Sequence, residues 1–155
     1  MVVPLSKFGM VSGTPGLAGG GPSPDLDAFR RHIVGRVFDS YCDAATWRAV
    51  IAHGTQACGL DQKTAELAAE MELETLLVAN EVALLKQMEG MLRQFTERDK
   101  KLDAKEKSDL VQMICRVNPG FAKGLRHDVA ESFIADFCRQ NGVKVKVGLF
   151  RWAIP

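Results

Sequence analysis

The 155-residue sequence lacks any arrangement of residues typical of a catalytic, metal-binding or phosphate-binding site. No C-x-x-C pair occurs, and no two His or Cys residues stand three or four positions apart, the spacing that brings two ligands to one metal ion on a helix. The glycines between Gly16 and Gly21 are not followed by Lys-Ser/Thr, as a phosphate-binding loop requires. We therefore predict no cofactor and no metal site.

A nucleophile beside a base is also missing from the linear sequence. The best available set is Cys115, His127 and Asp128, and Cys115 lies in an apolar helical pattern. A buried thiol without a cationic neighbour is unreactive. Whether the protein is an enzyme stays open at this point, with a non-enzymatic protein favoured.

Long apolar runs are absent as well. No run approaches the ~20 residues of a membrane span, so we expect no membrane partner. No apolar run follows Lys7, which argues against a secretory signal. Three of the four cysteines fall in apolar helical patterns rather than in a disulfide framework, which favours a reducing compartment and a cytoplasmic location.

Residues 1–24 contain no acidic side chain but six glycines and four prolines. Such a segment cannot bury enough apolar surface to offset the entropy lost on ordering, so we predict a disordered leader. Its Ser/Gly/Pro-rich composition also fits a bacterial secretion signal. Residues 25–155 are then a single helical domain.

Apolar residues at three- and four-residue spacing predict the helices of this domain. One starts at Ser23-Pro24-Asp25 and carries Leu26, Phe29, Ile33, Val37 and Tyr41 on its inner face. The others are expected at 46–58, 61–98, 104–117 and 127–141. The fold class is therefore mainly α, a bundle of about five helices around one long central helix.

The predicted helix 61–98 is the most informative element, because it contains no proline and has one wide apolar stripe. Residues 62–97 would span about 54 Å, whereas a compact domain of this size is on the order of 40 Å across. The helix must therefore break, for which Gly90 is the favoured position, or protrude and pair with another surface. Asn80 lies within the stripe, where it would either fix the register of paired helices or lie at the stripe's edge. The partner-binding residues predicted on this helix are Leu77, Asn80, Leu84, Met88 and Met91.

The run DKKLDAKEKSDL (99–110) resembles the Asp-Gly-x-hydrophobic-Ser-x-x-Glu turn of tellurite-resistance TerB-like helical domains. In this run Lys100 stands in place of that glycine. The resemblance covers about a dozen residues, and it implies an all-helical bundle.

The period changes to two after Gly142, which predicts a single C-terminal β-strand at 143–152 whose pairing partner the sequence does not identify. From Arg116 to Pro155 there are seven basic and three acidic residues. Cationic and aromatic side chains on one face can contact phosphates and stack on bases. Alternatively, lysines protect an edge strand from aggregation. The nucleic-acid-binding residues predicted here are Lys144, Lys146, Phe150, Arg151 and Trp152.

The sequence thus favours a protein-interaction or adaptor module with a regulatory role, which self-associates as a homodimer or higher homo-oligomer through the long helix or the C-terminal strand. The alternative hypothesis is a small nucleic-acid-binding regulatory protein. Partner identity, biological process and oligomeric state are not encoded in any pattern that we can interpret.

Overall fold

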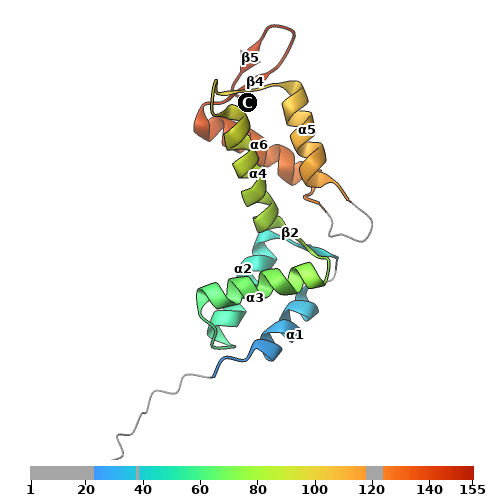
Figure 1. The fold of residues 1–155 in the computed structure, drawn as a ribbon, viewed down its shortest axis with the longest axis vertical. Helices are drawn as coiled ribbons and strands as arrows, with labels where there is room; N and C mark the ends of the chain where they lie inside the picture. Colours follow the sequence, from blue (N-terminus) through green and yellow to red (C-terminus); the bar gives the residue numbers. More distant parts are fainter. Residues whose placement is uncertain (1–22, 38, 118–123) are drawn as a thin grey trace, which may run out of the picture.

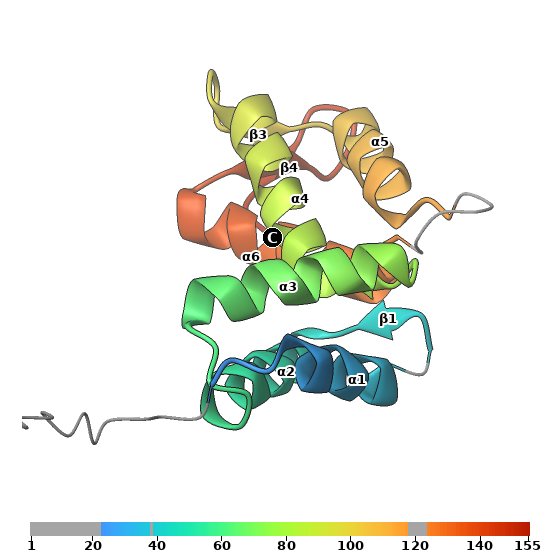
Figure 2. The same ribbon diagram turned by 60° about the horizontal axis from the view of Figure 1, so that its bottom comes forward.

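The computed structural model describes residues 23–37, 39–117 and 124–155, and within these ranges the protein is mainly helical with short strands. The predicted leader lies outside the described residues, apart from 23 and 24. The helices form two units, each around its own buried cluster of apolar side chains. Figure 1 shows them one above the other along the long axis of the molecule, and in Figure 2 the first unit again lies below the second.

The first unit spans residues 25–80. Its three helices each begin at an aspartate whose carboxylate accepts a hydrogen bond from a backbone amide of the first turn, at Asp25, Asp43 and Asp61. The core of this unit is centred on Phe29, Ile33 and other fully buried side chains. The elements are α1 (Leu26–Arg36), β1 (Tyr41–Cys42), α2 (Ala44–Gln56), α3 (Gln62–Thr75) and β2 (Ala79–Asn80).

The second unit spans residues 81–155. Its core joins Met88 and Leu92 of one helix to Leu110 and Ile134 of two others. The elements are α4 (Glu81–Thr96), β3 (Lys101–Leu102), α5 (Ala104–Cys115), α6 (His127–Asn141), β4 (Lys144–Lys146) and β5 (Trp152–Ala153).

The two units repeat one order of elements: a helix, a short strand, two helices, and a second short strand parallel to the first. Strands β1 and β2 are parallel, and so are β3 and β4. A residue with positive φ precedes the first strand of each pair, Ser40 (φ 56°) in one unit and Lys100 (φ 55°) in the other. The carbonyls of these two residues accept equivalent hydrogen bonds, from Ala79 N at 3.0 Å and from Lys144 N at 2.9 Å. The two halves of the described chain therefore have the same order of elements and the same parallel strand pairing.

The prediction of one helix over 61–98 is wrong. The segment is divided into α3 and α4 by a turn in which Leu77 adopts the left-handed conformation (φ 55°). The Val78 amide donates to the Leu73 carbonyl (2.8 Å) and the Leu77 amide to the Glu74 carbonyl (3.1 Å), the pattern of a Schellman motif. Gly90, where we expected the break, lies within α4 instead.

The prediction of a single strand over 143–152 is also wrong. The described residues contain five strands, and the C-terminal segment forms a hairpin in which β4 and β5 are antiparallel. Strand β4 pairs on its other side with β3, so the sheet order is β3-β4-β5. Because β3 has only two residues and lies 42 positions before β4, no local pattern pointed to it. Tyr41, expected on the first helix, belongs to β1.

Candidate functional site

The structure separates the five residues predicted to bind a partner on the long helix. Met88 is fully buried in the second core, and Leu84 and Met91 pack against the same core. Leu77 is 45% exposed in the turn that ends α3. The second half of the apolar stripe is therefore used inside the protein, against α5 and α6.

Asn80 has a local role that its place in the stripe concealed. Its Oδ1 accepts hydrogen bonds from the amides of Val82 (3.1 Å) and Ala83 (3.3 Å), so Asn80 is the N-cap of α4. From the stripe we had predicted that Asn80 either selects the register of paired helices or lies at the stripe's edge. Neither prediction includes the capping of a helix. The available signal was the residue type itself, because Asn is one of the residues most strongly preferred at a helix N-cap.

Three of the five residues of the nucleic-acid hypothesis, Lys144, Lys146 and Trp152, come together on the outer face of the β3-β4-β5 sheet. Phe150 and Arg151 lie in the connection between β4 and β5 instead. Lys144 pairs with Lys101 and Lys146 pairs with Trp152, so these four side chains share one face. The Lys101 ammonium lies over the Trp152 ring, 5.3 Å from its centroid. The opposite face carries Leu102, which is fully buried. Sequence analysis missed Lys101, because only the pairing of β3 with β4 brings it to this face.

The connection between β4 and β5 carries the most exposed apolar side chains of the described chain. Leu149 is 82% exposed and Phe150 is 91% exposed, and both lie between the exposed cations Lys146 and Arg151. The Val147 amide donates to the Arg151 carbonyl (2.9 Å), which closes the hairpin just before its tip. Figure 1 shows this loop projecting beyond the helices at one end of the molecule.

The two units meet at Glu81, one of the few buried charged residues. Its carboxylate accepts hydrogen bonds from the Tyr41 hydroxyl (2.8 Å) and the Ala44 amide (3.2 Å). The Arg126 guanidinium lies 3.5 Å from the same carboxylate and 4.5 Å from the centre of the Tyr41 ring. Partial burial, and then the hydrogen bond to Glu81, raise the pKa of Tyr41. The Glu81 carboxylate thus links Tyr41 and Ala44 of the first unit to Arg126 of the second.

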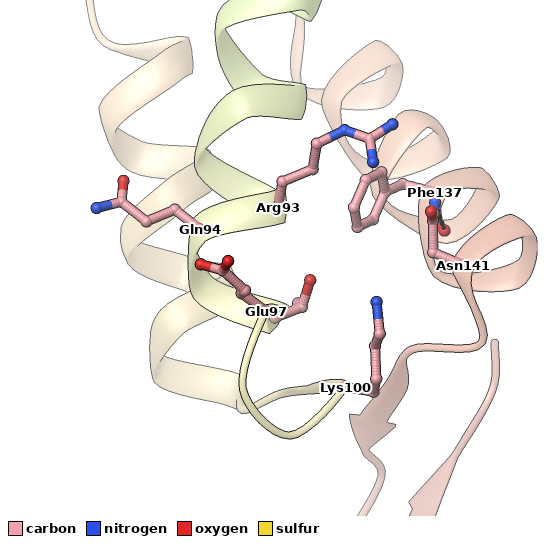
Figure 3. A pocket seen from close by; sticks show the side chains of 7 residues that line it. Arg93, Gln94, Glu97, Lys100, Phe137 and Asn141 are labelled. Carbon is pink, nitrogen blue, oxygen red and sulfur yellow. Dashed lines mark hydrogen bonds between the residues drawn. The ribbon is translucent and has the colours of Figure 1, made fainter.

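A shallow pocket of about 330 Å³ lies between α4 and α6 (Figure 3). Arg93 and Phe137 point toward one another across it, with 5.8 Å between the guanidinium carbon and the ring centroid. Arg93 already forms an ion pair with Glu89 (2.6 Å), and the Thr96 hydroxyl donates to the Leu92 carbonyl (2.8 Å). The lining side chains therefore do not form a nucleophile and base pair.

The cysteines and histidines do not assemble a reactive or metal-binding centre within the described residues. The four cysteines are buried, and burial raises the pKa of each thiol, that of Cys42 to about 11. His32 and His53 stack with parallel rings, 3.6 Å between centroids. The nitrogen lone pairs of an imidazole lie in the plane of its ring. In two stacked rings these planes are parallel, so the lone pairs do not point to one common ion.

Among the described helices, none is both long and apolar enough to cross a membrane. Comparison with protein-family models, with curated proteins and with solved structures finds no match to this chain.

Proposed function

We propose that the protein is a non-enzymatic interaction module that binds other proteins through its C-terminal hairpin. Further copies of the same chain are among the proteins that it binds. The observation that carries this proposal is the exposure of Leu149 and Phe150 at the hairpin tip. Burying a side chain of this size is worth about 1.5–3 kcal/mol, a gain that the isolated chain does not obtain. Binding to a partner with an apolar recess would recover it.

The form of the hairpin favours side-chain docking over strand addition. Strand β5 is the edge of its sheet, but it has only two residues and offers few backbone hydrogen bonds to a partner strand. Aromatic side chains, Phe among them, are enriched at the buried centre of protein interfaces, where hot spots fill well-packed pockets. We therefore assign the docking role to Phe150 and Leu149, in place of the long-helix residues first considered.

A photoreactive phenylalanine analogue at position 150 tests this proposal in the protein's own cells. The expected result is a covalent adduct with a specific protein, identified by mass spectrometry. The same analogue at Gln112, an exposed position on α5, is the matched control and should give no such adduct. A protein adduct that forms equally from both positions would contradict a docking role for the hairpin.

A second candidate function, binding of nucleic acid, is favoured by the cationic face of Lys101, Lys144 and Lys146 around Trp152. Lysines contact phosphates, and an indole ring stacks on bases. Fluorescence anisotropy with single- and double-stranded probes tests it: affinity should fall steeply with salt, and Lys144→Glu with Lys146→Glu should abolish it. Anisotropy that stays constant at low salt would remove this candidate.

The cytoplasmic location and the absence of a cofactor remain part of the proposal. Four buried thiols without disulfides support a reducing compartment.

A further inference from the structure

The charge of the chain is divided unequally between its two units. Residues 25–80 carry nine acidic and five basic side chains, a net charge of −4, whereas residues 81–155 carry ten acidic and fourteen basic ones, a net charge of +4. The overall charge of +1 conceals this asymmetry. A molecule with a negative and a positive end attracts further copies of itself in a head-to-tail orientation.

The outer face of α3 in the negative unit has an apolar and acidic stripe. Leu67, Glu70, Met71 and Glu74 follow each other at spacings of three, one and three residues, which places them on one side of the helix. All four are exposed, with Leu67 at 57% and Met71 at 58%. Neither Glu70 nor Glu74 forms an ion pair with a described residue. We call these four residues the α3 stripe.

The hairpin tip in the positive unit has the complementary composition. It offers two apolar side chains, Leu149 and Phe150, between two cations, Lys146 and Arg151. The α3 stripe offers two apolar side chains and two carboxylates. Figure 1 shows α3 and the hairpin toward opposite ends of the long axis, so one chain cannot bring its own hairpin to its own stripe.

We propose that the hairpin tip of one copy docks on the α3 stripe of a second copy, a step that rests on the proposed function. Phe150 and Leu149 pack against Leu67 and Met71, while the cations beside the tip face the two glutamates. The interface joins two different surfaces, so it is heterologous: each added copy leaves one stripe and one hairpin free, and the assembly grows as a chain or closes as a ring.

Sedimentation velocity on the purified full chain tests the proposal, from about 1 µM to about 500 µM protein, a range that covers weak to moderate affinities. The average mass should rise with concentration at low salt, and fall when screening shortens the Debye length from about 30 Å to about 3 Å. Phe150→Ala should weaken the association about tenfold to a hundredfold. Met113→Ala removes an apolar side chain of 56% exposure from α5, outside both surfaces, and should leave the association unchanged.

Charge exchange identifies the two surfaces. Lys146→Glu with Arg151→Glu, and separately Glu70→Lys with Glu74→Lys, should each abolish association. All four substitutions in one chain should restore it, because the attractive pairs are rebuilt with the signs exchanged. Exposed positions tolerate these changes, and circular dichroism of each variant verifies its fold.

A monomer at every concentration would overturn head-to-tail association, as would an association that Phe150→Ala leaves intact or a fourfold variant that does not recover. The proposal would also be overturned if the hairpin variants lost binding to oligonucleotides but kept the association between copies. The proposed function is judged separately, since an adduct between position 150 and a different protein supports it even when the purified chain stays monomeric.

Discussion

The two units of this protein share a scaffold and differ in what covers their paired strands. On the outer side of the β1-β2 pair, Tyr41 of the first unit lies beside Glu81, the first residue of α4, and Arg126 of the second unit packs on both. In the second unit, the equivalent side of β3-β4 carries Lys101, Lys144 and Lys146, all exposed. The same surface of the repeat thus joins the halves of the molecule in one case and remains available in the other. The comparison shows that this surface of the repeat is covered in the first unit and exposed in the second.

The largest expected effect tests whether the two cores are independent. Phe29 and Leu110 are both fully buried, one in each unit. Phe29→Ala should cost about 3–5 kcal/mol and Leu110→Ala about 2–5 kcal/mol, from lost burial and the cavity left behind. Hydrogen exchange with mass spectrometry should show loss of protection mainly in the unit that carries the change. Equal loss across both units in either variant would show that the cores unfold as one.

The junction between the units provides the next comparison. Ala79 pairs with Tyr41 as Lys144 pairs with Lys101, so Glu81 and Lys146, each two residues further on, occupy equivalent positions. Glu81→Ala should lower the free energy of unfolding by about 1–3 kcal/mol, since the Tyr41 hydroxyl and the Ala44 amide lose their acceptor. Lys146→Ala should change it by less than about 0.5 kcal/mol, as is usual at exposed sites. Urea denaturation measures both. Similar losses for the two variants would mean that the second pair of strands is covered after all.

A smaller effect is expected at the left-handed residues that end α3 and α6. Gly142 (φ 65°) has open space around an added Cβ, so Gly142→Ala tests backbone conformation alone and should cost about 1 kcal/mol. At the equivalent position Leu77 (φ 55°), substitution by glycine should stabilise the protein by about 0.5 kcal/mol, because relief of the left-handed strain exceeds the added flexibility. Denaturation midpoints measure both changes. Destabilisation by Leu77→Gly would instead assign the dominant role to the leucine side chain.

The same pair of turns explains which features the sequence could predict. The predicted end of the helix 127–141 is confirmed, because Gly142 is the residue type that the left-handed conformation after α6 favours. The predicted start of the helix at 104 is confirmed as well, because Asp103 and Glu106 form a capping box there. The end of α3 was missed, because Leu77 adopts a conformation usually reserved for glycine and the apolar stripe continues through it. Lys100, which stands where the TerB-like turn has glycine, also has positive φ (55°).

The candidate site could be predicted only in part, for a reason of chain separation. Lys144, Lys146 and Trp152 are close together in the sequence, and their place on one face was predicted. Phe150 was predicted with them but lies in the connection between β4 and β5. Lys101 joins them only through the pairing of β3 with β4, and Arg126 reaches Glu81 only through the docking of the units. A strand of two residues is too short to show the alternation of apolar and polar residues that identifies a strand. Its pairing with a distant segment therefore cannot be predicted from the hydrophobic pattern.

The smallest expected effect is a pH dependence confined to the first unit, where His32 stacks on His53 between α1 and α2. Burial, then the charge of His53 and that of Arg36, lower the pKa of His32 below its ordinary value of 6.5. Between the lowered pKa and 6.5 the unfolded chain binds more protons than the folded one, so stability falls as the pH falls through this range. Chemical denaturation from about pH 7.5 to about pH 5 should show a modest decline that His53→Asn reduces, since that variant removes one of the causes. His127→Asn, a change on an exposed residue of the second unit, should preserve the decline. Stability that stays constant or rises on acidification would mean that protonation of His32 does not oppose folding of the first unit.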